Sequence, residues 1–287
     1  MIVNHPRSQP AMAMLLWLMA VLISEAANSQ FYYKDLVVPA QTAAQLTRFQ
    51  QNRIRSVKLL SYERDGLPTE GFSGSQRISS DYKKLTTQLQ TAYAGASTLT
   101  SFFDDKGHLL RSIDTADGAG SISSYSYNGQ GRLTSITNVS TSFGQSNEKE
   151  EHQWYYSANG QPERMLRIKN NLDTTVVSFV LDEKGQVVEE IAKRKNTAPQ
   201  SFYYYYDDAG RLTDIVSYNT KAGRLLPAYI FEYEAEDRLR SMMVVPEGSD
   251  DYQKWHYTYN MEGLKAKEEC RNKRRQLLGR IEYEYTR

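Results

Sequence analysis

The segment Tyr204-Tyr205-Tyr206-Asp207-Asp208-Ala209-Gly210 decides the fold, because variants of it recur through the last two thirds of the chain. Each variant closes a run of mostly aromatic, strand-forming residues with a short polar residue, two arbitrary residues and usually Gly. The seven segments of this kind are residues 101–107, 125–131, 154–160, 179–185, 204–210, 231–237 and 257–263. Their last residues lie 24, 29, 25, 25, 27 and 26 positions apart. Such a period is typical of proteins that repeat one supersecondary unit.

One unit is predicted to be a strand followed by a three-residue hairpin loop. Loops of this length are usually a type I turn followed by a left-handed residue, where Gly avoids the Cβ clash. The register places a polar residue opposite Arg in three units, as the pairs Asp207 with Arg211, Asn128 with Arg132, and Glu234 with Arg238. The sixth unit has Asp237 in the place of Gly, and we expect a strained turn there that is still formed.

The alternation of side chains assigns the two faces of the sheet. One face is expected to form the core, and it collects Phe103, Tyr125, Tyr127, Trp154, Tyr156, Val177, Phe179, Leu181, Phe202, Tyr204, Tyr206, Tyr229, Phe231, Tyr233, Trp255, Tyr257, Tyr259, Ile281, Tyr283 and Tyr285. The other face is mostly polar, with Tyr155, Tyr203 and Tyr205 as exceptions. A sheet with one buried and one solvated face is typically antiparallel.

The predicted fold is all-β: an antiparallel meander of repeated hairpins that forms a twisted or rolled open sheet, with a short N-terminal helix over Gln41–Arg53. Ile residues follow the turn residue by five positions in two units and by six in two others, which predicts a bulge whose position varies. A small outer-membrane barrel is the competing architecture. Arg167, Lys169, Glu189 and Glu190 argue against it, because they place charge on both sides of the strands.

Three regions are predicted along the chain. Residues 1–29 form a signal peptide, residues 30–98 a helix and irregular strands, and residues 99–287 the repeat sheet. Within the second region, residues 57–66 resemble an eighth, degenerate unit, and residues 67–98 are expected to form irregular strands and loops.

The signal peptide is predicted from an apolar run, residues 11–23, that is short for a bilayer span and is followed by small residues. Cleavage after Ser29 leaves Gln30 as the new N-terminus, and cleavage after Ala26 fits nearly as well. A retained membrane anchor is the alternative. We expect a periplasmic or extracellular protein with no transmembrane segment after cleavage.

Composition excludes several classes of protein. The chain has 287 residues, with 35 Lys and Arg against 34 Asp and Glu, and this balance argues against a nucleic-acid-binding protein. The single cysteine, Cys270, excludes a disulfide scaffold and is expected to be a buried small residue. His108, His152 and His256 are not at metal-ligand spacing, so neither a metal nor another cofactor is predicted. The carboxylates are expected in turns or on the solvated face.

The segments at residues 205–212 and 127–133 resemble the tyrosine–aspartate (YD, or Rhs-type) repeat, and the looser likeness extends over residues 99–287. Members of that family are bacterial envelope or secreted proteins, and long members coil a β-ribbon into a hollow shell around a toxin or effector. The resemblance implies a short secreted member with a stacked-hairpin sheet. This chain has longer spacing, few units and no following toxin region.

Two functions are predicted from these observations. The preferred one is a non-enzymatic envelope module with a structural or binding role, whose partner is a glycan or an envelope protein. Tyr155, Tyr203, Tyr205 and His256 on the polar face are its candidate binding residues, because exposed rings can stack on sugars or apolar patches. The alternative is a hydrolase of envelope polysaccharide or peptidoglycan that uses paired carboxylates.

Overall fold

A computed structural model of the protein describes residues 30–92, 94–116, 118–142, 148–220, 222–246, 249 and 251–287. The predicted signal peptide, residues 1–29, lies outside the described residues. The helical elements are the π-helix η2 (Tyr32–Val37), the α-helix α2 (Val38–Gln51) and the short 3₁₀ segment η3 (Ala235–Asp237). The strands are β1 (Ser56–Glu63), β2 (Ser73–Ile78), β3 (Lys84–Thr91), β4 (Gly95–Phe103), β5 (Leu109–Ala116), β6 (Ala119–Tyr127), β7 (Leu133–Ser142), β8 (Glu148–Tyr156), β9 (Pro162–Lys169), β10 (Asp173–Leu181), β11 (Val187–Arg194), β12 (Gln200–Tyr206), β13 (Leu212–Asn219), β14 (Arg224–Tyr233), β15 (Leu239–Val244), β16 (Gln253–Tyr259), β17 (Lys265–Asn272) and β18 (Leu277–Thr286).

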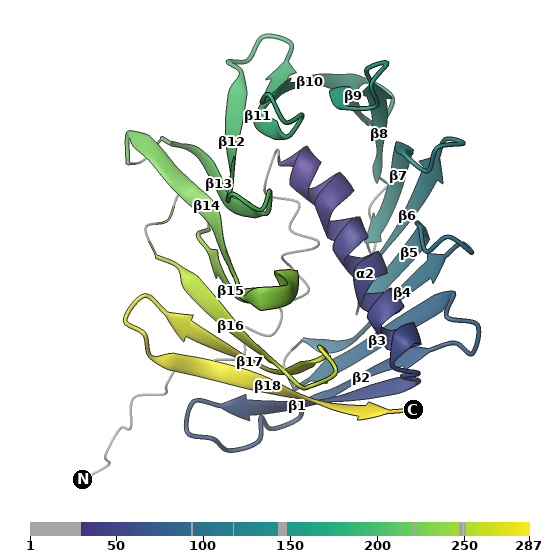
Figure 1. The fold of residues 1–287 in the computed structure, drawn as a ribbon, viewed down its shortest axis with the longest axis vertical. Helices are drawn as coiled ribbons and strands as arrows, with labels where there is room; N and C mark the ends of the chain where they lie inside the picture. Colours follow the sequence, from purple (N-terminus) through teal and green to yellow (C-terminus); the bar gives the residue numbers. More distant parts are fainter. Residues whose placement is uncertain are drawn as a thin grey trace.

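These strands form one antiparallel meander that closes on itself. Each strand pairs with the next along the chain, and β1 pairs with both β2 and β18. At the closure Val57 lies opposite Tyr285 and Leu59 opposite Tyr283. The predicted open sheet is therefore wrong: the sheet is a closed shell of 18 strands (Figure 1). Closure removes the two unpaired edges that an open sheet would expose.

The N-terminal helical segment lies inside this shell, where α2 runs across the interior in Figure 1. Its two ends pack on different parts of the wall. Phe31 and Tyr33 are buried against strands β6–β15, and Leu46 and Phe49 are buried beside β1–β5 and β18. The helix was predicted to begin at Gln41, after Pro39, but helical geometry begins near Tyr32. Burial of Phe31 and Tyr33 in the shell extends the helix beyond the point where local sequence signals predict its start.

The hairpin turns follow the predicted design. In the fifth unit Gly210 N–H donates to the Asp207 carbonyl (2.9 Å), and Asp207 Oδ1 accepts the Arg211 N–H (2.9 Å). Gly210 has a φ of +79°, the left-handed conformation that favours Gly. Asp237 in the sixth unit has a φ of +56°, so the turn without Gly is kept in a strained conformation, as predicted.

The bulge lies at one position in all seven units, so the expectation of a varying bulge is wrong. Tyr206 pairs with Leu212 and Tyr205 with Asp214, which leaves Thr213 as the extra residue. The equivalent extra residues in the other units are Leu110, Thr134, Glu163, Val188, Arg240 and Ala266. This constant bulge turns the fifth residue after each turn inward and the sixth outward. Ile113 and Ile191 therefore point outward, and the strand pairing in their units is the same as in the others.

Tyrosine hydroxyls join most of the hairpins to the hairpin before them. The last residue of most unit strands is a Tyr whose hydroxyl donates to a backbone carbonyl just after the preceding turn, at 2.7–2.9 Å. The pairs are Tyr127 with Leu109, Tyr156 with Leu133, Tyr206 with Val187, Tyr233 with Leu212, Tyr259 with Leu239 and Tyr285 with Lys265. Phenylalanine could not make this contact, which explains why Tyr is so frequent in the repeat.

The predicted faces are confirmed by burial. Trp154, Tyr204 and Phe231 on the inward face are at most 4% exposed, whereas Tyr205 on the outward face is 51% exposed. The degenerate eighth unit is also confirmed, since the turn at residues 63–66 has the hydrogen bonds of the others and ends at Gly66 with a φ of +85°.

Residues 67–98 are more regular than predicted. They contain β2, β3 and the start of β4, and the predicted boundary at residues 98 and 99 falls within β4. These Ser-, Thr- and Gln-rich strands carry few apolar residues, but Ile78 and Leu85 point inward and are buried. Pairing with neighbouring strands supplies the regularity that the local sequence does not signal.

Candidate functional site inside the shell

The inward-facing position five residues after each turn is occupied by a buried carboxylate in two of the seven units. Its seven occupants are Ser112, Ile136, Met165, Glu190, Ile215, Met242 and Glu268. Most are apolar, as expected for a core position, but Glu190 and Glu268 bring a carboxylate there with 0% and 1% exposure. The expectation that carboxylates lie only in turns or on the solvated face is wrong.

Glu190 binds the start of the N-terminal helical segment. Its Oε1 accepts the backbone N–H groups of Gln30 (2.9 Å) and Phe31 (3.0 Å), and its Oε2 accepts that of Tyr32 (2.9 Å). The Tyr204 hydroxyl donates to the same Oε2 at 2.9 Å. Burial raises the pKa of Glu190, and these hydrogen bonds oppose the rise. A carboxylate at this end of a helix also interacts favourably with the helix dipole.

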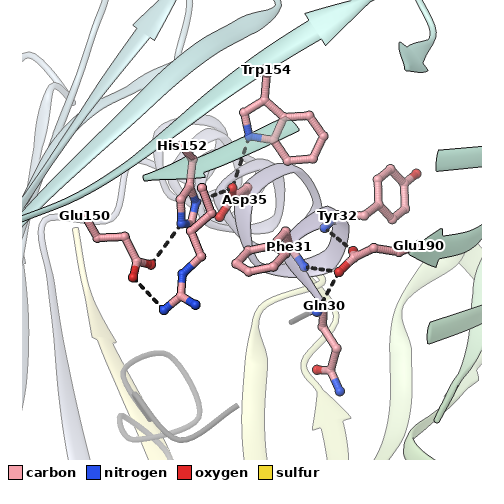
Figure 2. A network of polar contacts seen from close by, with 9 residues as sticks. Gln30, Phe31, Tyr32, Asp35, Glu150, His152, Trp154 and Glu190 are labelled. Atoms are coloured by element: carbon pink, nitrogen blue, oxygen red, sulfur yellow. Dashed lines mark hydrogen bonds and ion pairs between the residues drawn. The ribbon is translucent and has the colours of Figure 1, made fainter. Parts of the chain in front are cut away.

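A second polar contact fixes the same segment through Asp35, as Figure 2 shows. Asp35 Oδ2 lies 2.7 Å from His152 Nδ1 and 3.0 Å from the indole Nε1 of Trp154, which donates to it. His152 Nε2 lies 2.9 Å from Glu150 Oε1. Arg167 completes the row with an ion pair to Glu150 at 2.7 Å. Carboxylate, imidazole, carboxylate and guanidinium thus alternate inside the shell.

The alternating charges of Asp35, His152, Glu150 and Arg167 shift the pKa values of His152 and Glu150. Burial lowers the pKa of His152, but Asp35 and Glu150 more than offset this and raise it to about 9. Burial raises the pKa of Glu150, but His152 and Arg167 outweigh burial and lower it to about 2. His152 is therefore a cation at neutral pH, and both of its nitrogens donate hydrogen bonds. An imidazole that is protonated at neutral pH between two carboxylates anchors the segment and is poorly suited to act as a general base at that pH.

Glu268 has a different environment. Its Oε2 lies 3.6 Å from Lys265 Nζ, and its buried Oε1 has no hydrogen-bond partner among the described residues. Burial raises its pKa, and Lys265 opposes the rise. Cys270 nearby is fully buried, and burial raises the pKa of its thiol to about 12. Cys270 is a buried core residue, as predicted.

A cavity of about 380 Å³ adjoins the anchored segment. Asp35, Leu36 and Pro39 line it from the helical segment, and His108, Arg132 and Tyr156 line it from the shell wall. His108 Nδ1 lies 2.9 Å from Asp104 Oδ2, and its ring stacks on Tyr127 at a centroid distance of 4.7 Å. Among the residues that line this cavity, Asp35 is the one carboxylate.

The four sequence-predicted binding residues point outward but do not come together. Tyr155 lies on β8, Tyr203 and Tyr205 on β12, and His256 on β16. Successive groups are four strands apart, which corresponds to ~19 Å along the sheet at about 4.8 Å per strand. The structure therefore joins only Tyr203 and Tyr205 in one patch.

The exposed rings differ in their surroundings. Tyr155 is 37% exposed, its hydroxyl donates to Gln153 Oε1 (3.1 Å), and the Arg164 guanidinium lies 4.5 Å from its ring centre. Tyr205 is half exposed, and Tyr203 is partly buried. His256 is also partly buried, and burial and the cations Lys254 and Arg271 lower its pKa.

Sequence reasoning missed the interior residues Glu190, Asp35 and His152. A signal for Glu190 was present, because aligning the repeats on their turns places it in a column with Ile215 and Met165. No comparable signal marks Asp35, since its partners are 117 and 119 positions away in the chain.

Within the described ranges, no group of three or more His, Cys, Asp or Glu side chains is arranged to hold a metal ion. In the same part of the chain, no helix has the length and apolar character needed to cross a bilayer.

Comparison with known proteins gives a family-model match to one segment of the chain and weak structural likenesses. Among curated proteins none matches the sequence. The crystal structure of TcdB2-TccC3-Cdc42 is similar at 20% identity and a TM-score of 0.35, over 75% of this chain and 12% of that chain, so the present chain spans a small part of that protein. Porin-like proteins from Bacteroides uniformis and Bacteroides vulgatus are similar at 10% and 14% identity, with TM-scores of 0.37 and 0.27, over 81% of this chain and 98% of each of theirs.

The family comparison agrees with the hairpin geometry described above. Residues 103–142 match the RHS repeat family, and they include the turns after Phe103 and Tyr127 and the hydroxyl contact from Tyr127 to Leu109. In residues 103–142 the chain is therefore similar to the YD-type repeats of the RHS repeat family.

Proposed function

We propose that the protein is a non-enzymatic module of the bacterial cell envelope, secreted or periplasmic, with a structural or binding role. In this proposal the closed repeat shell encloses the chain's own N-terminal segment and offers its outer wall to a glycan or protein partner. The signal-peptide pattern at residues 1–29 supports export, and the RHS repeat supports an envelope role.

The main support for the proposal is that polar groups inside the shell bind the chain's own N-terminal segment. Glu190 binds backbone amides of the N-terminal segment, and Asp35 joins that segment to His152 and Trp154. Interior groups that hold the chain's own segment act in folding. In this proposal a partner binds the outer wall, where Tyr205 and Tyr155 are exposed.

The competing hypothesis is a hydrolase with paired carboxylates. Such an enzyme needs two carboxyl groups facing each other across a substrate site, at about 5–10 Å. The cavity beside the helix is lined by Asp35 as its one carboxylate, and Asp35 is already bound to protonated His152. This arrangement favours the non-enzymatic hypothesis.

The test combines location with binding. A C-terminally tagged protein is followed by cell fractionation, and the purified mature protein is incubated with peptidoglycan, envelope polysaccharide and membrane extract. We expect it in the periplasm or medium, with retention by one envelope fraction and no release of soluble fragments. Tyr203→Ala with Tyr205→Ala should weaken retention about tenfold or more, since aromatic contacts contribute ~0.5–1.5 kcal/mol each beyond the buried area.

Met261→Ala is the matched control, because Met261 is an exposed apolar residue in a turn away from β12. Cytoplasmic accumulation would contradict the envelope location. Catalytic release of sugar or peptide fragments would favour the hydrolase, and undiminished retention of the Tyr203/Tyr205 double variant would remove those rings from the binding surface.

A further inference from the structure

We propose that the chain is cleaved between Ser29 and Gln30, and that the new α-ammonium group of Gln30 forms an ion pair with Glu190 inside the shell. The proposal rests on the exported state assumed under the proposed function. It adds the position of the cut and a folding role for the new terminus.

The first argument is the position of the Gln30 nitrogen. It lies 2.9 Å from Glu190 Oε1, at ion-pair distance, and Gln30 is 5% exposed. Among the described residues, the other hydrogen bonds to Glu190 come from uncharged groups, namely two further backbone amides and the Tyr204 hydroxyl. A fully buried carboxylate is stabilised most by an opposite charge in direct contact. Lys34, in the same segment, also interacts electrostatically with Glu190, and a terminal ammonium would add a cation in direct contact.

The second argument is the backbone conformation of Gln30. Its φ is +71°, in the left-handed region where a residue with a side chain is strained. The strain comes from the crowding of Cβ by the adjoining peptide groups, and a terminal residue has no peptide group before it. Cleavage ahead of Gln30 therefore relieves the strain at a position that the Glu190 contact holds in place.

The geometry also selects between the two cleavage sites that the sequence allows. A cut after Ala26 would leave three residues ahead of Gln30 and place the ammonium group up to ~10 Å farther along the chain, at about 3.3–3.6 Å per residue. Only the cut after Ser29 puts the charge at the Glu190 carboxylate.

The chemical step is an ordinary peptide hydrolysis by a membrane-bound signal peptidase. The bond between the Ser29 carbonyl carbon and the Gln30 nitrogen breaks. Water supplies the oxygen that completes the Ser29 carboxylate, and the Gln30 nitrogen takes protons to become the ammonium. An N-terminal glutamine can then cyclise with loss of ammonia, which would remove the charge, so the ion pair requires the open form.

The first experiment determines the N-terminus of the exported protein by intact mass and N-terminal sequencing. We expect a chain that begins at Gln30 with a free amine. A chain that begins at Ala27 or keeps residues 1–29 would overturn the cleavage site, and a mass 17 Da lower, from cyclised glutamine, would overturn the ion pair.

The second experiment measures the role of the charge, independently of where the protein is located or what it binds. Fusion proteins are cut in vitro to leave chains that begin at Gln30 or, with one extra residue, at Ser29, each with Glu190 or with Glu190→Gln. The chain that begins at Gln30 should melt about 5 °C or more above the longer one. In the Glu190→Gln background this difference should disappear.

A chain that begins at Gln30 and is acetylated on its α-amino group is the matched control. It differs from the native terminus by one charge and a small group, and it should melt close to the chain that begins at Ser29. If Glu190→Gln does not fold, the acetylated protein decides the question by itself. Equal melting temperatures for the free and acetylated termini would overturn the ion pair.

Discussion

The backbone N–H of Gln30 donates a 2.9 Å hydrogen bond to Glu190 Oε1 across 160 positions of the chain. A strand of the seven-unit repeat region thereby holds the beginning of the helical segment inside the closed sheet. The shell and its contents are linked parts of one fold, and the predictions below follow from that link.

Substitution of the two buried glutamates should have opposite effects. Glu190→Met should lower the free energy of unfolding by at least ~3 kcal/mol, because three backbone N–H groups lose their acceptor. Glu268→Met should raise the melting temperature by a few degrees, because it removes a buried carboxylate with one oxygen that has no partner in the part of the chain that the structure describes. Met occupies the same repeat position at Met165 and Met242, so its size fits. Chemical and thermal denaturation of both variants test this prediction. Destabilisation of similar size in both would contradict the different roles of Glu190 and Glu268.

Stability should fall as the pH rises from about 6.5 to 9. His152 has a folded-state pKa of about 9, above its ordinary value of 6.5. Its contribution is complete below pH 6.5 and is lost as the pH rises through 9, up to roughly 3 kcal/mol in total. Unfolding free energies measured from pH 6 to 10 should show this slope, and His152→Gln should flatten it. A wild-type profile as flat as that of the variant would show that folding does not raise the pKa of His152.

The two faces of β12 should respond differently to loss of their rings. Tyr203→Ala with Tyr205→Ala should leave a folded protein with a melting temperature close to that of the wild type, because Tyr205 is half exposed. Tyr204→Ala with Tyr206→Ala should destabilise by several kcal/mol, since Tyr204 is 2% exposed and both hydroxyls are bonded inside the shell. Thermal unfolding compares the pairs, and equal melting temperatures would be inconsistent with these faces.

The hydroxyl contacts between hairpins should each contribute measurably. Tyr233→Phe removes the 2.8 Å bond to the Leu212 carbonyl and should cost ~0.5–1.5 kcal/mol. Tyr155→Phe is the matched control, because its hydroxyl bonds a surface Gln153 side chain, and it should cost little. Denaturation midpoints test the pair. If Tyr233→Phe behaved like Tyr155→Phe, the tyrosine hydroxyl bonds between hairpins would have no role in stability.

The repeat, the faces and the hairpin turns were predictable from sequence because they depend on local spacing. Asp207, Gly210 and Tyr206 lie within five positions, and their roles follow from turn chemistry and strand alternation. Closure was not predictable, because β1 meets β18 through a pairing of Val57 with Tyr285 that no local signal specifies.

The interior site could not be predicted either, because it also depends on contacts between residues that are far apart in the chain. Asp35 reads as an ordinary charged residue next to a helix, and its burial depends on His152 and Trp154 more than a hundred positions later. Glu190 was visible as an exception in the repeat column, but its partners could be named only once the segment was placed inside the shell. The helix start was missed for the same reason, since Phe31 and Tyr33 are buried by strands far along the chain.

Hydrogen exchange of the mature protein, followed by mass spectrometry of peptides from residues 31–51, tests most directly whether the shell is folded around this segment. We expect these amides to exchange as slowly as those of β10–β13, because Phe31, Tyr33, Leu46 and Phe49 are buried against the shell wall. Complete exchange within seconds, while the strands stay protected, would contradict an enclosed segment and would show that the shell folds without it.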